Sequence, residues 1–455
     1  MDNTIVIKLL ILFFIFAVAI IRCFFAYKKK NSSKYLLISC FVQTIPFNIS
    51  SILYNYSQIP PLGEFGSKIS IDSSFLFCGI FLLLGLSKLK SDIFSWEKNK
   101  WLYIFIIFSI ISFFNPINPF IESVFVPLFF LIQLILLLKI IEANFTKDEI
   151  FRGIYDGLAI TTIVQCFLAI CFPILGMEFM ASIFRGDRAL EVTYKREDYV
   201  SAVGTFSHPG DLSLYVTLLL TFLLNCYFNG YKKMISLFLI LMNLFVLYLT
   251  FSRTSFAISI SVMFFVFLAN RNRNIFSLKN ILLGFLFLLA VFIIFMYVPV
   301  LNNLFFQSDV DLQTGNRLMH WFIGIEIWEE SQWIGLGINS HVYYMYHFIK
   351  SEIEFFVVNP VHNIHIIALA ETGIVGFSFW IYYFISRIYK FSQPESISQP
   401  EQIMSKTCAG LLFAYFFYGF FGWAPFKKEL LTLLIFFLYL APLGRTFLLK
   451  QDKSL

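Results

Sequence analysis

Residues 235–269 read ISLFLILMNLFVLYLTFSRTSFAISISVMFFVFLA, which is two apolar runs joined by a short polar segment. A helix needs about 20 predominantly apolar residues to cross a bilayer, so each run is close to the length of one membrane span. The polar segment, residues 250–255, predicts a tight hairpin between two neighbouring spans. It contains Arg253, although an arginine inside a membrane helix costs on the order of 2.5 to 3.5 kcal/mol on insertion scales. Arg253 therefore needs either the headgroup region or an anionic ligand beside it.

The whole chain has the composition of a membrane protein. Hydrophobic residues make up 58% of the 455 residues and charged residues only 14%, whereas charged residues are about 25% of a typical soluble domain. The mean hydropathy is +0.77. We therefore expect an all-α polytopic membrane protein that forms a single transmembrane domain over residues 1–455. About 13 candidate spans, roughly 12 to 14, lie near residues 4–26, 35–54, 73–88, 101–114, 122–141, 154–177, 211–229, 235–252, 254–269, 281–301, 362–386, 407–424 and 430–447.

Lysine and arginine predict the orientation of these spans, because basic loops stay on the cytoplasmic side. Alternate loops carry basic clusters that agree with one another. They predict a cytoplasmic carboxyl terminus and an outer amino terminus. The clusters lie at residues 28–34, 88–100, 147–152, 232–233, 271–279 and 387–406.

Two long outer loops, residues 178–210 and 302–361, carry basic residues against this bias, and we expect both to be partly helical. An anionic ligand handled on the outer side would account for these residues. A solvated segment, with its basic residues matched by neighbouring acidic ones, would account equally for the first loop. The basic residues in question are Arg185, Arg188, Lys195, Arg196 and Arg317.

The second loop has helical periodicity. From Arg317 onward the apolar residues recur at helical spacing, which predicts an amphipathic helix along the outer membrane surface that begins at residues 315–316 and ends at residues 335–337. The apolar residues are Leu318, Trp321, Phe322, Ile325 and Trp328. Five of the six histidines lie between His320 and His365. Most of them are interpreted as residues of the membrane interface or of a substrate wall.

His362 opens the next predicted span, and Glu371 follows nine residues later. At about 1.5 Å per helical residue, the carboxylate would lie roughly 13 Å deeper than the histidine. An ionisable residue inside a membrane span is a candidate for function by default. The alternative is a structural ion pair with an arginine or lysine of a neighbouring span.

Metal and cofactor chemistry have little support in the sequence. His362 and His365 are three residues apart and could share a metal ion, but the outer loops offer no obvious third ligand. The cytoplasmic loops hold no glycine-rich phosphate-binding segment with a lysine. We expect no metal and no other cofactor.

Four segments, in this order along the chain, resemble the signatures of the O-antigen ligase and Wzy-type polysaccharide polymerase superfamily. They are Gly204-Thr205-Phe206-Ser207-His208-Pro209-Gly210, Leu249-Thr250-Phe251-Ser252-Arg253-Thr254, the segment from Asn316-Arg317 through Trp321 to Gly335-Leu336-Gly337, and His362-Asn363 through Ala370-Glu371-Thr372-Gly373-Ile374-Val375-Gly376. Arg188 and Gly204 also have the Arg-x15-Gly spacing of some Wzy-type polymerases. The matching spacing after Arg317 is absent, because Trp328 occupies the position of the glycine.

The resemblance implies a metal-independent membrane glycosyltransferase of GT-C type in the bacterial cytoplasmic membrane, with its active site on the periplasmic or outer face. Polymerases of this superfamily join undecaprenyl-pyrophosphate-linked oligosaccharides into O-antigen, capsule or exopolysaccharide, whereas ligases transfer the glycan to lipid A-core. The partners implied are the lipid-linked donor and acceptor, the bilayer and a chain-length regulator protein, with no nucleic acid. A lipid-linked oligosaccharide flippase is a further alternative, although transporters tend to show internal repeats and polar sites at the membrane midplane.

The chemistry of such a transfer assigns roles to particular residues. Arginine suits a leaving pyrophosphate because of its fixed charge and bidentate geometry, so Arg253 and Arg317 are expected to hold the pyrophosphate. Histidine can accept a proton near neutral pH, which makes His362 the expected base for the acceptor hydroxyl. The substrate-binding candidates are Arg188, His208, Trp321, Asn363 and Glu371.

Overall fold

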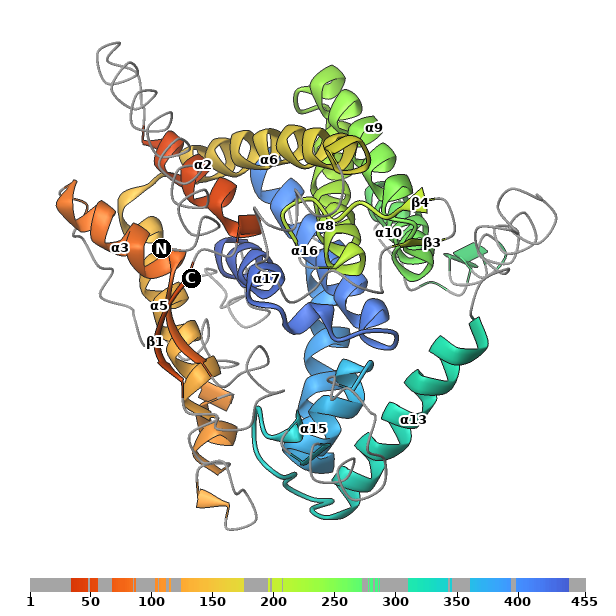
Figure 1. Ribbon diagram of the computed structural model, residues 1–455. Helices are drawn as coiled ribbons and strands as arrows, with labels where there is room; N and C mark the ends of the chain where they lie inside the picture. The colour runs from red at the N-terminus through yellow and green to blue at the C-terminus, as the bar shows by residue number, and fades with distance from the viewer. Residues whose placement is uncertain are drawn as a thin grey trace, which may run out of the picture.

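Most of the residues that the computed structural model describes lie in helices (Figure 1). The described residues are 34–47, 50–55, 68–84, 86, 103–104, 106–111, 114–115, 124–175, 195–196, 199–206, 208–271, 277, 279–280, 283–284, 286, 310–342, 344–345, 361–393 and 398–441. The predicted span at residues 4–26, most of the one at residues 281–301, and Arg188 lie outside them.

Five described helices are long and apolar enough to cross a membrane: α5 (Phe125–Asn144), α6 (Lys147–Leu175), α8 (Pro209–Phe228), α10 (Arg253–Arg271) and α15 (Ile364–Ser392). Three shorter apolar helices accompany them in the described part of the chain: α9 (Lys233–Leu249), α3 (Ser73–Leu83), and α2 (Tyr35–Thr44) with the turn that follows it. The expected class, a mainly helical multi-pass membrane protein, is confirmed. The count of about 13 spans stays a prediction.

The most deeply buried of these helices is α8, which is surrounded by α9, α10 and α16 (Gln399–Gly419), with α6 nearby (Figure 1). Its first turn forms because His208 caps it. The His208 Nδ1 atom accepts a hydrogen bond from the Gly210 amide at 2.9 Å, and Pro209 occupies the first helical position, where its missing N–H costs nothing.

Hydroxyl and amide side chains join α8 to α10 at intervals of one or two turns. Ser213 donates to Ser255 at 2.5 Å, the hydroxyls of Thr217 and Ser259 are 2.6 Å apart, and the Asn270 amide donates to Asn225 at 2.8 Å. Small hydrogen-bonding side chains let membrane helices approach closely and replace polar contacts that lipid cannot supply. This polar seam fixes the position of the first residue of α10, Arg253, relative to the first turn of α8.

The predicted span at residues 35–54 is wrong in its second half. Helix α2 ends at Thr44, a 3-10 turn follows at Ile45–Phe47, and β1 (Ser50–Asn55) pairs antiparallel with β2 (Lys68–Asp72). Pro46 explains the end of the α-helix, because proline has no backbone N–H to donate to the carbonyl four residues earlier. A second small pair, β3 (Lys195–Arg196) with β4 (Tyr199–Val200), lies in the first long loop. The fold is therefore not purely helical.

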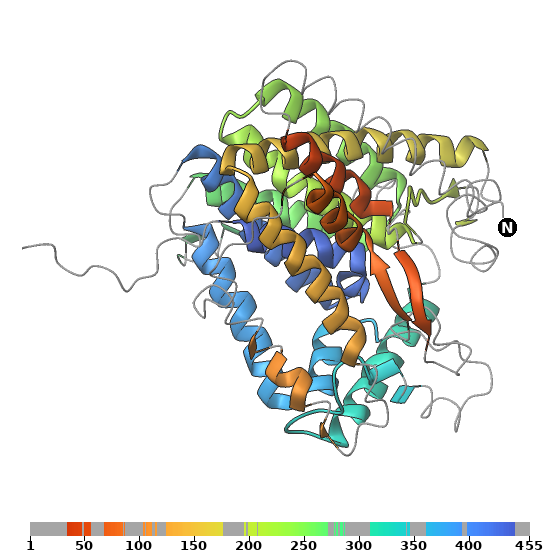
Figure 2. The ribbon, with the colours of Figure 1, turned by 90° about the vertical axis from the view of Figure 1, so that its left-hand side faces the viewer.

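Helix α13 (Val310–Glu329) packs against α15, and both views place α13 and the first part of α15 at the opposite end of the molecule from α2 and α6 (Figures 1 and 2). The expected helix of the second loop is therefore present, but it begins at Val310 rather than at residues 315–316. Helix α15 is broken at Gly373, whose φ of 62° and ψ of −174° are not helical.

The charged residues described for the central helices lie at their two ends. One end holds Lys232, which pairs with Asp156 at 4.0 Å, and Lys406, which donates to Asn270 at 3.0 Å. Arg271 ends α10 beside this group. These are basic residues that the charge pattern assigns to the cytoplasmic side. The other end holds Arg253 and the start of α17 (Lys428–Leu440).

Candidate active site

One side chain in the last turn of α16 contacts the first signature segment and the residue that follows the second, and it lies within the electrostatic influence of the third. The Tyr418 hydroxyl donates to the Gly210 carbonyl at 3.3 Å, and it also hydrogen-bonds to Ser255, two residues after Arg253. The charge of Arg317 acts on the same hydroxyl. The first, second and third segments therefore approach one another at Tyr418.

The fourth segment meets α16 at the adjacent residues. His365 donates from Nε2 to the Phe416 carbonyl at 2.8 Å and accepts the Trp380 indole N–H at Nδ1, at 3.1 Å. Gly419 leaves no room for a side chain, because an added Cβ would overlap Ile364. The first turn of α15 is thus held against the last turn of α16. Both ring nitrogens of His365 make hydrogen bonds within the protein, so His365 is a structural residue and not part of a substrate wall.

Arg253 lies where the sequence predicts it, in the hairpin between α9 and α10. The turn is made by Thr250 and Phe251, whose φ is 48°, and Arg253 is then the first residue of α10. The Arg253 side chain is half-buried. Its guanidinium adds its charge to the partial positive charge of a helix amino terminus, which favours an anion at this position.

His362 is held on two sides by α13. Its Nδ1 atom lies 3.3 Å from Nδ1 of His320, with the two rings stacked at a centroid distance of 5.4 Å, and its carbonyl oxygen accepts the Trp321 indole N–H at 3.4 Å. Arg317 lies one turn before His320 on α13, so the two side chains are neighbours on that helix. Helix α13 thereby carries Arg317 toward His362, as well as toward Tyr418.

Three of the substrate-binding candidates make structural contacts. Asn363 caps α15, since its side-chain oxygen accepts from the amides of His365 at 2.9 Å and Ile366 at 3.2 Å. His208 caps α8, and Trp321 anchors His362. Their contacts with substrate stay predictions. In the structure, Asn363 and His208 cap the helices α15 and α8, and Trp321 holds His362 against α13.

Glu371 does not pair with an arginine or a lysine in the described contacts. Its carboxylate accepts the Nδ1–H of His341 at 2.6 Å, and both side chains are buried. His341 is therefore also a core residue rather than an interface residue. The alternative considered for Glu371 was an ion pair with an arginine or lysine of a neighbouring span; the described partner is instead a histidine of the second loop.

The glycine signature at residues 335–337 pairs with the break in α15. Leu336 and Gly337 donate their amides to the carbonyls of Ala370 and Glu371 at 2.9 and 3.0 Å, and Ile374 donates to the Gln332 carbonyl at 2.8 Å. The third and fourth signatures are therefore joined through their backbones. The break at Gly373 leaves backbone N–H and C=O groups of α15 without helical hydrogen bonds, and residues 332–337 of the loop form hydrogen bonds with them.

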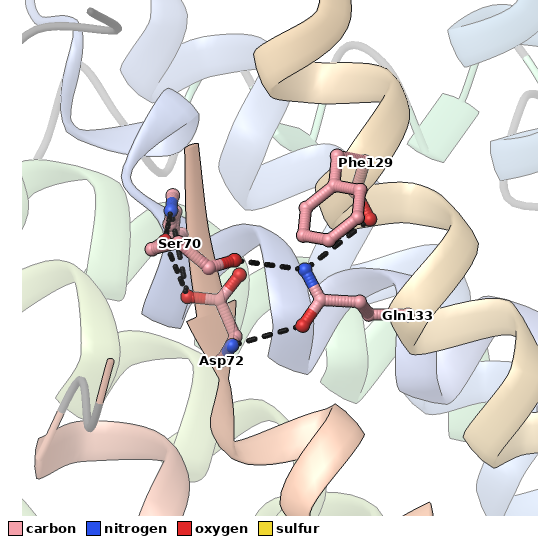
Figure 3. Close-up of polar contacts among 5 residues, drawn as sticks. Ser70, Asp72, Phe129 and Gln133 are labelled. Atoms are coloured by element: carbon pink, nitrogen blue, oxygen red, sulfur yellow. Dashed lines mark hydrogen bonds and ion pairs between the residues drawn. The ribbon is translucent and has the colours of Figure 1, made fainter. Parts of the chain in front are cut away.

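Two lysines near the site were missed by the sequence analysis. Lys427 forms an ion pair with the buried carboxylate of Asp211 in the first turn of α8, and Lys428 pairs with Asp72 at 3.4 Å. Figure 3 shows Asp72 with Ser70 and Gln133: the Gln133 side chain accepts the Asp72 amide at 2.9 Å and donates to the Ser70 carbonyl at 2.9 Å. Burial raises the pKa of Asp72, and Lys428 acts in the opposite direction.

The signal for these lysines was available. The loop between the predicted spans 407–424 and 430–447 falls on the outer side by alternation, so Lys427 and Lys428 break the charge rule as the two long loops do. The two lysines were overlooked because this loop is much shorter than the other two.

The described residues contain no group of three or more His, Cys, Asp or Glu side chains that could hold a metal ion. Within the same limits, the polar contacts found in the first turns of α8 and α10 and beside His362 involve hydroxyls, a lysine–carboxylate pair and a histidine. Such a set can bind an anion and accept a proton.

Comparison with known protein families gives the class of protein. Residues 235–381 match the Wzy_C family model, described as O-antigen ligase. This family comprises membrane glycosyltransferase-like enzymes, the ligases and related polymerases. The match includes the segments that hold Arg253, Arg317 and His362, while Gly204–Gly210 precede it. The chain thus carries an O-antigen ligase (Wzy_C) domain, and the resemblance found in the sequence is confirmed. No curated protein matches the chain.

Proposed function

We propose that this protein polymerises undecaprenyl-pyrophosphate-linked oligosaccharide repeat units into a surface polysaccharide, on the outer face of the bacterial cytoplasmic membrane. The observation that carries the proposal is the approach of α8, α10 and α15 to Tyr418 and Gly419, with α13 packed on α15, which brings together the helices bearing Arg253, Arg317 and His362. Two fixed cations and a base are what a transfer from a lipid pyrophosphate requires.

In the proposed reaction, a hydroxyl of the acceptor sugar attacks the anomeric carbon of the donor glycan. The bond between that carbon and the pyrophosphate oxygen breaks, and undecaprenyl pyrophosphate leaves with the bonding electron pair. His362 takes the hydroxyl proton, while Arg253 and Arg317 stabilise the charge that develops on the pyrophosphate. Arg188, His208, Trp321, Asn363 and Glu371 remain the candidate substrate-binding residues, and a chain-length regulator remains a candidate partner.

A ligase that transfers the glycan to lipid A-core is the second candidate function, because the matched family is described as O-antigen ligase. The two activities differ in their acceptor. Loss of a polymerase leaves single repeat units on the acceptor lipid, whereas loss of a ligase leaves long chains on the undecaprenyl carrier.

The direct test uses the purified protein in lipid nanodiscs with an undecaprenyl-pyrophosphate-linked repeat unit. We expect a ladder of elongated lipid-linked glycans without any added nucleotide or metal. Arg253→Ala, Arg317→Ala and His362→Ala should each abolish the ladder while the protein accumulates normally. Arg271→Ala is the matched control for Arg253, because Arg271 lies at the other end of the same helix. Transfer to lipid A-core without elongation would assign the protein as a ligase, and a normal ladder from His362→Ala would contradict the mechanism.

A further inference from the structure

His320 is the side chain that contacts the ring of His362. It is only 3% exposed, and it lies on the face of α13 that packs against α15, together with Ile323 and Ile327. The two Nδ1 atoms are 3.3 Å apart in nearly parallel rings, at an angle of 29°. The sequence predicts a place at the membrane interface or in a substrate wall for most of the histidines between His320 and His365, and His320 takes no part in the proposed reaction.

A hydrogen bond between two Nδ1 atoms needs one nitrogen with a hydrogen and one with a free lone pair. A neutral imidazole carries a single N–H. If His362 is to accept a proton at Nε2, its hydrogen must be on Nδ1, and His320 must be the acceptor. Once His362 has taken the proton, both of its nitrogens carry hydrogens, and only an accepting His320 still fits the contact.

Burial lowers the pKa of His320, which keeps its ring neutral and able to accept. The charged and titratable neighbours are consistent with His320 as the neutral acceptor and His362 as the donor. Arg317 lies one turn earlier on α13 and disfavours a second cation. On α15, His365 is directed to α16 and Glu371 to His341, so neither supplies a carboxylate to His320. From α16, Tyr418 lies within the influence of Arg317.

We infer that His320 is a positioning residue, which accepts the Nδ1–H of His362, fixes its tautomer and stabilises the imidazolium formed during transfer. This inference rests on the proposed role of His362. The arrangement corresponds to a base that is oriented by a third group, with a neutral histidine where many enzymes have a carboxylate. A carboxylate at this place would compete with the pyrophosphate for Arg317, and a neutral ring does not.

The first test measures His362 itself and needs no turnover. Neutral histidine reacts with diethyl pyrocarbonate, so mass spectrometry of the modified His362 peptide against pH gives its apparent pKa in the full-length protein. His320→Leu fills the site without an acceptor and should lower that pKa by roughly half to one unit. His320→Asn offers its side-chain oxygen near the position of Nδ1 and should leave the pKa close to that of the wild type. His341→Asn, at another buried histidine of the same loop, is the control and should not move it.

The direction in which the pKa of His362 changes in His320→Leu shows which of the two histidines donates the hydrogen bond. If His320 donated to His362 instead, removing it would raise the pKa of His362, and a rise or no change in His320→Leu would overturn the inference. An equal shift in His320→Leu and His320→Asn would also overturn it, since the acceptor atom would then be irrelevant.

The second test is elongation by the same variants. His320→Leu should lower kcat by about tenfold or more, a part of the roughly 10²- to 10⁴-fold that a general base supplies, with little change in KM and with the acidic limb of the pH profile moved to lower pH. His320→Asn should recover most of the rate. A shifted pKa in a protein whose wild type elongates nothing would refute the proposed function and leave the His320–His362 contact established. An active wild type with full activity in His320→Leu would refute the inference alone.

Discussion

The hydroxyl of Tyr418 donates a hydrogen bond to the carbonyl oxygen of Gly210, 208 residues earlier in the chain, at 3.3 Å. The same carbonyl accepts from Ser213 at 2.8 Å, and the Ser213 hydroxyl oxygen lies 2.5 Å from that of Ser255. Tyr418 therefore closes a polar group that links α8, α10 and α16 next to Arg253. This group holds the first turn of α10, which begins at Arg253, against α8 and α16.

Tyr418→Phe should lower elongation by roughly three- to tenfold and the free energy of unfolding by about 1 to 2 kcal/mol, because the buried hydrogen bonds to Gly210 and Ser255 are lost while the ring is kept. Elongation rates and thermal unfolding would be measured on the same preparations. Tyr155→Phe is the control, since Tyr155 is also buried and its hydroxyl is 3.1 Å from that of Ser236, away from the site. It should show a similar loss of stability without the loss of activity. Equal activities in the two variants would contradict the role of Tyr418.

The ion pair between Lys427 and Asp211 should be strongly coupled. Lys427→Met leaves a buried carboxylate without its cation, which typically costs about 3 to 5 kcal/mol, whereas replacing both members of a buried pair can be nearly neutral. We therefore expect Lys427→Met to be much less stable than the double variant Lys427→Met/Asp211→Asn. Chemical unfolding of the wild type, both single variants and the double variant gives the coupling energy. Additive effects of the two substitutions would show that the pair contributes no coupling.

The backbone junction between residues 332–337 and the break in α15 should be intolerant of side chains. Gly373 has a φ of 62°, and an added Cβ would overlap the backbone of Trp333. Gly373→Ala should therefore lower stability by at least about 1 to 3 kcal/mol and separate Glu371 from His341. Gly79→Ala is the control, because nothing lies within 4 Å of an added Cβ there. Unfolding temperatures and expressed amounts of the two variants give the comparison, and equal stability would be inconsistent with the junction.

Helix α13 illustrates how far the sequence predicts this structure. The periodicity from Leu318 to Trp328 correctly indicated a helix, but the face that packs against α15 contains His320, Ile323 and Ile327, while Leu318 and Phe322 are exposed. In a membrane protein both lipid-facing and protein-facing surfaces are apolar, so hydrophobic periodicity does not distinguish them.

The sequence reveals candidate site residues whose chemical type is unusual in an apolar chain. It does not reveal residues whose role depends on a partner that is distant in the sequence. Arg253, Arg317 and His362 stand out because charge and protonation are unusual in an apolar chain. The partners of Glu371 and His362, which are His341 and His320, depend on how the loop folds onto α15. No periodicity or spacing encodes that contact.

The buried histidine also predicts how stability depends on pH. Burial lowers the pKa of His320 in the folded protein, so the unfolded chain binds a proton at pH values where the folded protein does not. Stability is therefore greatest above the ordinary pKa range of histidine and decreases as the pH falls through it. The slope contributed by one such group is at most about 1.4 kcal/mol per pH unit. His320→Asn cannot titrate, so the difference in unfolding free energy between wild type and variant should change in favour of the variant from pH 8 to pH 5. Unfolding curves at several pH values measure that difference, and a constant difference over the range would mean that His320 is not held neutral by the fold.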